Sequence, residues 1–461
     1  LYGIAIDLGS TTIAAHLCDL QTGEIINSSG IMNPQIRFGE DLMSRVSFSM
    51  MNDDGTDKLK ETVQESLNSL FQALIKETEI DPKLVVELSI VCNPVMHHLL
   101  LGINPTELGQ APFALASSDS LYFKNDHIGL NFLDNANLYL LPCIAGHVGA
   151  DAAAVILSEA PNESEETVLI IDVGTNAELI LGNKSELYAC SSPTGPAFEG
   201  AQISSGQRAA PGAIEKIKID PISKDPIFKV IGCDYWSNEE QFQNFLSNQK
   251  ITGICGSGII EAIAEMRMTG ILDASGLIGT SSETGSERCI SEGRTNSYIV
   301  YKNMVNDETE IKITNSDVRA IQLAKAALFA GSRLLMDEMK IDKIDKIILA
   351  GAFGAHISTK HAMVLGMIPD CNLKKVTSAG NAAGAGAMIA LLNRKSRLEI
   401  SKTVKKINKI ETAMAPKFQE YFVSASAIPN SMFSFPELEK VMKLPDVSFN
   451  QKKRSKRANY N

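Results

Sequence analysis

Two short strings of the sequence have the residue types that bind phosphate groups. Each follows an apolar run and reads Asp-x-Gly before small polar residues, at Asp7 to Thr12 (DLGSTT) and at Asp172 to Asn176 (DVGTN). The glycine lets the backbone approach a ligand closely, and the following N–H groups and hydroxyls can cradle phosphate oxygens. A carboxylate at a strand end can hold Mg²⁺ through water. One such turn alone is more typical of an ordinary β-turn than of a phosphate site, but two in matching surroundings favour a pair that clamps a triphosphate.

A third glycine-rich segment lies late in the chain. Residues 347–354 read IILAGAFG, and residues 378–384 read SAGNAAG. Glycines at the ends of late strands, here Gly351 and Gly354, would let a planar base and its ribose lie against the backbone. Tight packing of a helix on a strand is the alternative for this segment taken alone.

The elements that must position these strings occur in the same order twice. Apolar alternation and helical spacing predict strands at 2–6, 12–17, 24–27, 85–91 and 138–141, and helices at 59–75, 94–101 and 149–159. After a polar linker at 162–166, the pattern predicts strands at 168–171, 177–181, 186–190, 346–349 and 375–377, and helices at 256–270, 317–339 and 381–392. An insertion near 210–250 and a hairpin near 289–313 are expected in the second half. The first half therefore reads βββαβαβα, and the same order begins again in the second half, so we expect this order in each lobe.

A module used twice predicts an α/β protein with two similar lobes and a ligand cleft between them. We expect lobe I to span residues 1–165 and lobe II residues 166–395. The remaining residues, 396–461, are expected to form C-terminal helices and a basic tail.

Composition excludes several other classes of protein. The 461 residues contain 54 acidic and 43 Lys or Arg side chains, a net charge of −11, so a nucleic-acid partner is not expected. The basic residues at 452–457 are interpreted as a solvated tail. The most apolar stretch, 138–157, contains His147 and Asp151 and so does not suit a membrane span. Eight scattered cysteines without a CxxC pair indicate reduced core residues of a cytoplasmic protein.

The three glycine-rich strings resemble the phosphate-1, phosphate-2 and adenosine motifs of the acetate kinase/sugar kinase/heat-shock cognate/actin superfamily. That resemblance spans about residues 2–393. Within it, further strings are similar to one narrower family, the ATPase domain of reductive activators of corrinoid-dependent enzymes. They are 92–105 (CNPVMHHLLLGINP), 192–201 (SPTGPAFEGA), 205–215 (SGQRAAPGAIE), 253–258 (GICGSG) and 418–423 (FQEYFV).

The resemblance implies two ribonuclease-H-like, actin-like ATPase lobes with ATP and Mg²⁺ between them. It also implies an ATPase that returns an oxidised corrinoid protein of a methyltransferase system from Co(II) to Co(I). Full-length members typically carry an N-terminal [2Fe–2S] domain as electron donor. No cysteine cluster is present here and Leu1 already lies in a strand pattern, so we expect a downstream portion of a longer polypeptide. Whether the chain forms a homodimer is left open.

The resemblance also implies roles for individual residues. Asp7 would hold Mg²⁺ through water, and Asp172 would orient the attacking water. The phosphates would be contacted in the two turns, at Gly9, Ser10, Thr11, Thr12, Gly174, Thr175 and Asn176. Glu199 and Gly200 would belong to a loop that contacts ribose and phosphate. Gly351 and Gly354 would line the adenosine.

The sequence also allows other functions for the chain and other roles for some of its residues. A small-molecule kinase, for a sugar or an acid, is the alternative, with Asp151 or Glu199 as its catalytic acid. A chaperone-type ATPase would need a peptide-binding β-domain that the pattern does not predict. His97 and His98 favour a structural or surface role over contact with a corrinoid partner. We interpret Cys255 as a small buried residue and not as a reactive one. For Arg208, pairing with an anion and a structural role both stay possible interpretations.

Overall fold

The computed structural model describes residues 1–133, 135–174, 176–246, 249–303, 310–354 and 356–449. The chain forms two compact units. The first contains Leu1–Ser192, Leu334–Ala355 and Lys374–Ala415, and the second contains Pro193–Arg333, His356–Leu373 and Pro416–Asn461. The sequence division at 165 and 395 stays a prediction, and the basic residues at 452–457 lie outside the described residues. In the part of the chain that is described, no helix has both the length and the apolar character needed to cross a membrane.

The first sheet of the first unit has the order β3-β2-β1-β4-β6-β5. Its strands are β1 (Tyr2–Leu8), β2 (Thr12–Asp19), β3 (Ile25–Met32), β4 (Val85–Cys92), β5 (Leu121–Lys124) and β6 (Asn137–Leu140). Strands β1, β2 and β3 pair antiparallel, whereas β4 lies parallel to β1 and β6 parallel to β4. Strand β5, which the sequence did not predict, adds an antiparallel edge.

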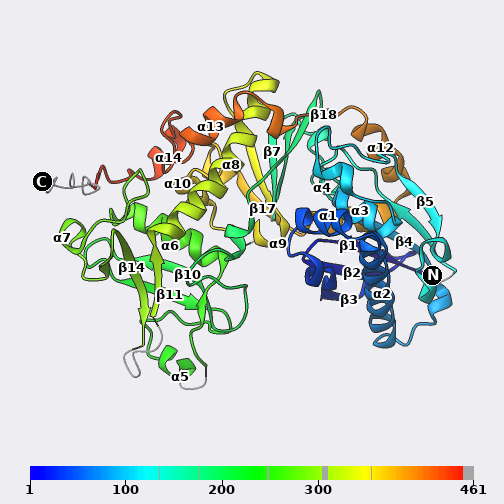
Figure 1. Cartoon of the computed structure of the whole chain (residues 1–461), viewed down its shortest axis with the longest axis horizontal. Coiled ribbons are helices and arrows are strands. Elements are labelled where there is room, and N and C mark those ends of the chain that lie inside the picture. Colours follow the sequence, from blue (N-terminus) through cyan, green and yellow to red (C-terminus); the bar gives the residue numbers. More distant parts are fainter. Residues whose placement is uncertain (134, 175, 247–248, 304–309, 355, 450–461) are drawn as a thin grey trace, which may run out of the picture. The chain divides into compact units, whose positions relative to one another are not determined.

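Three helices accompany this sheet in blue and cyan in Figure 1: α1 (Leu42–Met51), α2 (Gly55–Lys76) and α3 (Pro94–Leu101). The apolar face predicted for residues 59–75 is confirmed, since the helix buries Leu59, Val63, Leu67, Leu70, Phe71 and Leu74. Helix α3 has the predicted start, because the Asn93 side chain accepts a hydrogen bond from the Met96 N–H and Pro94 follows it.

The second sheet of the same unit repeats this plan, in the order β17-β16-β7-β8-β9-β18. Its strands are β7 (Val168–Val173), β8 (Ala177–Gly182), β9 (Leu187–Ser192), β16 (Lys346–Ala350), β17 (Val376–Gly380) and β18 (Asn408–Lys409). Strands β7, β8 and β9 are antiparallel, and β16 lies parallel to β7, as β4 does to β1. The predicted α/β fold with a repeated three-stranded start is confirmed.

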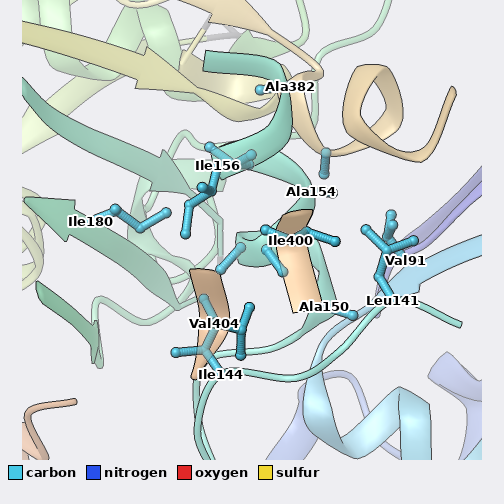
Figure 2. Close-up of a cluster of buried hydrophobic side chains, with 14 of the residues drawn as sticks. Val91, Leu141, Ile144, Ala150, Ala154, Ile156, Ile180, Ala382, Ile400 and Val404 are labelled. Carbon is cyan, nitrogen blue, oxygen red and sulfur yellow. The ribbon is translucent and has the colours of Figure 1, made fainter. Parts of the chain in front are cut away.

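Helices α4 (Ala150–Glu159) and α11 (Ala382–Leu392) pack together within one core that includes residues of both sheets. Figure 2 shows Ile180 of β8 on one side of this core, Val91 and Leu141 on the other, and residues of α4 between them. The two helices approach closely, because a Cβ on Gly386 would lie 2.0 Å from the Ala154 carbonyl oxygen. Small residues on both helices therefore fix the distance between α4, whose first turn contains Asp151, and α11, whose N-cap is Asn381. Helix α12 (Arg394–Val404) follows α11 and contributes Ile400 and Val404 to the same core.

The second unit contains two three-stranded sheets, green in Figure 1: β10 (Ala213–Ile219), β11 (Pro226–Val230) and β12 (Gly253–Ile254), and β13 (Cys289–Glu292), β14 (Thr295–Lys302) and β15 (Glu310–Thr314). The hairpin expected near 289–313 is present as β13 and β14, and β15 pairs with the other side of β14 as a third strand. The remaining helices of the chain are α5 (Phe242–Leu246), α6 (Gly256–Met268), α7 (Ser281–Thr284), α8 (Asn315–Met339), α9 (Gly351–Gly354), α10 (Thr359–Leu365), α13 (Phe418–Ser424) and α14 (Pro436–Val441).

Candidate functional site

The first Asp-x-Gly turn joins β1 to β2. Asp7 lies near the end of β1, opposite Ala14 on β2 and Val91 on β4. The Gly9 N–H donates to the Thr12 carbonyl oxygen at 3.1 Å, and a Cβ on Gly9 would lie 2.5 Å from that oxygen. Only glycine fits so close to another carbonyl. The turn is therefore tight, and its residues 10–12 keep part of their surface exposed.

Side chains from outside the repeat hold this turn in place. The Asn33 amide donates to the Gly9 carbonyl oxygen at 2.9 Å, and the Asn33 N–H donates to the Thr11 carbonyl oxygen at 2.8 Å. The Arg45 guanidinium donates to the Ser10 carbonyl oxygen. Neither Asn33 nor Arg45 was identified from the sequence, because both contacts join residues that no local pattern connects.

The second turn joins β7 to β8 in the same way. Asp172 lies opposite Glu178 on β8 and Ala350 on β16. The Gly174 N–H donates to the Asn176 carbonyl oxygen at 3.1 Å. Thr175 lies outside the described residues, so its predicted phosphate contact stays a prediction.

The late glycine segment lies directly beside Asp172. Gly351 has a φ of +83°, and a Cβ there would lie 2.5 Å from Asp172 Oδ1. The expected glycine turn at 351–354 is instead the short helix α9, which begins at Gly351 because this left-handed residue redirects the chain after β16. Gly354 accepts a hydrogen bond from the Ser378 hydroxyl at 3.2 Å. The predicted contact of these glycines with adenosine is untested.

Asn381 joins the second half of the chain to Asp7. Its side-chain oxygen caps α11 by accepting from the Gly384 N–H at 2.8 Å. Its side chain also hydrogen-bonds Asp7, which lowers the pKa of that carboxyl. Asn381 lies within the late glycine segment of the sequence but is not among the predicted site residues.

Four carboxylates interact at this place: Asp7, Asp151, Asp172 and Glu178. Burial, and then the charge of Asp151, raise the pKa of Asp7 to about 7. Burial, followed by the charges of Asp151 and Asp7, raises the pKa of Asp172 to about 7. Burial raises the pKa of Asp151 to about 6, and hydrogen bonds from backbone N–H groups, such as that of Ala152, oppose this shift. Each Asp-x-Gly turn therefore presents its carboxylate to the same region of the first unit.

Glu178 is a site residue that the sequence analysis missed. Burial, with the charges of Asp151 and Asp172, raises its pKa well above the usual range, and the Ser191 hydroxyl opposes the shift. A sequence signal for it exists, because the hairpin centred on residues 174–176 places Glu178 opposite Asp172, and a glutamate is unusual in so apolar a strand.

The donor set suits a cation that keeps most of its water. The carboxylates repel one another, so a positive charge among them would relieve that repulsion. Among the described residues no three acidic, His or Cys side chains gather closely enough to hold a metal ion by themselves. Mg²⁺ commonly takes one or two carboxylates, with water and substrate phosphates completing its coordination. The residues present therefore fit Mg²⁺ that arrives with a nucleotide.

The remaining predicted residues lie elsewhere. Glu199 ends a short 3-10 helix (Pro196–Glu199), and Gly200 follows it with a φ of +89°. Both belong to the second unit, and their contact with a nucleotide stays a prediction. His97 and His98 are buried, and His98 accepts from the Ala116 N–H at 3.2 Å, so the structural interpretation is confirmed. Cys255 is buried, as expected.

Comparisons with known proteins match most of the chain. Residues 166–439 match the family described as the C-terminal domain of RACo, the ASKHA domain, and residues 2–162 match the RACo middle region. The corrinoid activation enzyme RamQ of Eubacterium limosum is 33% identical over 442 residues, which cover 94% of this chain and 70% of that protein. The [Co(II) methylated amine-specific corrinoid protein] reductase of Methanosarcina barkeri is 27% identical over 436 residues, 90% of this chain and 74% of that protein.

A solved structure, that of a reductive activator for a corrinoid, iron–sulfur protein, superposes with a TM-score of 0.79 at 32% identity. The match covers 94% of this chain and 66% of that one, so the chain spans about two thirds of the solved activator.

Proposed function

We propose, because the chain belongs to the RACo family, that it forms the ATP-dependent part of an activator that returns a corrinoid protein from Co(II) to Co(I). The observation that carries the proposal is that the carboxylates of Asp7 and Asp172, which come from the two copies of the turn, are both buried and affect one another electrostatically. Two phosphate-binding turns that face one region suit a triphosphate better than a single turn does.

The chain's own residues supply binding and orientation for the phosphates. The turn at 9–12 and the turn at 174–176 would cradle the phosphate oxygens with their N–H groups and hydroxyls. Asp7, oriented by Asn381, would hold hydrated Mg²⁺, which neutralises charge on the phosphates when it is bound.

Asp172 is the residue we assign to hydrolysis. A carboxylate with a pKa near 7 can accept a proton from water at the pH of the cell. The charges of Asp151 and Asp7 raise the pKa of Asp172 further, which favours that proton transfer. Because phosphoryl transfer depends mainly on positioning and charge neutralisation, we expect these residues to support slow hydrolysis.

ATP would act on cobalt through coupling between two sites. Reduction of Co(II) to Co(I) is uphill from ordinary donors, and each tenfold in equilibrium corresponds to about 59 mV for one electron. If nucleotide binding changes the affinity for the corrinoid protein, that protein must change the affinity for nucleotide equally. The eight cysteines are scattered along the sequence without the close spacing of iron–sulfur ligands, so we propose that the electron comes from a [2Fe–2S] domain outside these 461 residues.

The experiment is an ATPase assay with and without a Co(II) corrinoid protein. We expect ATP hydrolysis that the corrinoid protein stimulates. In the alternative function, a small-molecule kinase, Asp151 would serve as the catalytic acid from its place in the carboxylate cluster. A panel of sugars and organic acids is therefore scored for phosphorylation in parallel. Phosphorylation of one of them, with no response to the corrinoid protein, would replace the proposal by the kinase.

A further inference from the structure

Helix α1 contains an arginine that is buried directly behind the first turn. Arg45 has 0% of its surface exposed. Its Nη2 donates to the Ser10 carbonyl oxygen at 2.5 Å, and its Nε donates to the Gly39 carbonyl oxygen at 3.1 Å. Its Nη1 contacts Gln35 Oε1 at 3.2 Å and Met96 Sδ at 3.4 Å. The guanidinium is thus held by neutral acceptors on several sides.

This charge has no carboxylate in direct contact, although Asp41, the N-cap of α1, acts on it electrostatically. Within the described ranges, no carboxylate oxygen lies within 4.0 Å of the Arg45 guanidinium, which forms none of the ion pairs found there. Burial lowers the pKa of Arg45 to about 10, so the side chain still carries its charge at neutral pH. A buried charge that forms no direct ion pair is destabilising. A bound anion at the turn would compensate it.

The turn in front of Arg45 has donors to offer such an anion. The carbonyl groups of Gly9, Ser10 and Thr11 are each held by Asn33 or Arg45. The backbone N–H groups of Ser10 and Thr11, in contrast, donate to no other group among the residues that the structure describes. Free N–H groups on a turn whose carbonyls are fixed from behind form an anion-binding concavity.

We propose that Arg45 is a nucleotide-positioning residue, which fixes the Ser10 carbonyl so that the N–H groups of Ser10 and Thr11 meet the phosphates, and whose charge favours the bound polyphosphate. The inference rests on the proposed function only in that this turn binds nucleotide phosphates. It does not require that a corrinoid protein is the partner.

The test compares affinities for ATP, ADP and adenosine by titration calorimetry with Mg²⁺ present. Arg45→Met removes the charge and the hydrogen bonds, and Arg45→Lys keeps the charge but cannot reach all the acceptors. The control is Arg37→Met, because Arg37 lies in the same region but donates to the Thr62 hydroxyl rather than to the turn. Thermal unfolding of each variant reports its folding.

In Arg45→Met we expect the affinities for ATP and ADP to fall about tenfold or more, the scale of hydrogen bonds to charged groups, while adenosine affinity changes little. Arg45→Lys should fall between wild type and Arg45→Met, and Arg37→Met should match wild type. Unchanged ATP affinity, or an equal loss for ATP and adenosine, would overturn the inference. If Arg45→Met does not fold, the same two outcomes in Arg45→Lys decide it. A wild type that binds ATP but ignores corrinoid proteins would contradict the proposed function alone.

Discussion

Asp172 and Glu178 lie directly opposite one another on β7 and β8, two carboxylates on neighbouring strands of one hairpin. Like charges in this position repel, and the repulsion is part of what raises the pKa of Glu178. The pair is costly for the fold, which is typical of a site where charge serves a ligand or a reaction rather than stability.

The role of Asp172 predicts a selective loss of turnover. Asp172→Asn keeps the shape and removes the charge, so we expect ATP to bind while hydrolysis drops roughly 10²-fold or more, the scale of a positioned general base. Single-turnover hydrolysis measured beside equilibrium binding separates the two effects. The control is Asp53→Asn at an exposed loop position. Intact turnover in Asp172→Asn would show that the two turns have been assigned the wrong roles.

The role of Asp7 predicts a selective loss of Mg²⁺-ATP binding. In Asp7→Asn we expect the affinity for Mg²⁺-ATP to fall about 10- to 100-fold, the scale for residues that hold a metal through water. The affinity for ATP measured with EDTA should change far less, because no Mg²⁺ is then present to be lost. An Asp7→Asn variant with the Mg²⁺ dependence of the wild type would remove Asp7 from the metal site.

Glu178 predicts a dependence of stability on pH. Its pKa in the folded chain lies above the unfolded value, so its stabilising contribution is fully present below the unfolded pKa and is lost as pH rises through the folded pKa. The Glu178→Gln variant cannot ionise at this position, so it does not lose this stability as pH rises. The free energy of unfolding of Glu178→Gln relative to wild type should therefore increase with pH above about 4.5, measured in urea without Mg²⁺ or nucleotide.

The matched control for this prediction is Glu65→Gln on the exposed face of α2, which should leave the slope unchanged. Parallel stability curves for wild type and Glu178→Gln across this pH range would refute the proposed repulsion among the carboxylates.

Gly351 predicts a loss of activity that backbone strain alone does not explain. Alanine at positive φ costs about 1–2 kcal/mol of stability, and here its Cβ would also meet Asp172 Oδ1. Gly285→Ala is the matched control, because Gly285 has a φ of +71° and open space around its Cβ position. Both variants should lose stability, but only Gly351→Ala should lose ATP turnover. Equal turnover in the two would separate Gly351 from the site.

The sequence predicted the local parts of this structure well. Strands β1, β2 and β7, helix α2 and the cap of α3 follow from apolar alternation, helical spacing and the Asn93-Pro94 pair. The twin turns at Asp7 and Asp172 could be identified because each is a local string with its own chemistry.

What the sequence could not provide were contacts between distant residues. Asn381 hydrogen-bonds Asp7 because the packing of α11 brings it beside the first turn. Arg45 hydrogen-bonds the Ser10 carbonyl because the packing of α1 places it behind the same turn. Nothing in the local spacing of either residue encodes that contact. The sequence indicated a hairpin near 289–313 but not its third strand, because the pairing of β15 with β14 is not specified by a local pattern.

The most direct measurement follows the cobalt itself. A Co(II) corrinoid protein is mixed with this chain and a chemical reductant in place of the electron-donor domain, and visible spectra are recorded with ATP, with ADP and with no nucleotide. We predict that Co(I) accumulates with ATP, that far less forms without it, and that Arg37→Met behaves as wild type whereas Asp7→Asn does not. Equal formation of Co(I) with and without ATP would contradict the account.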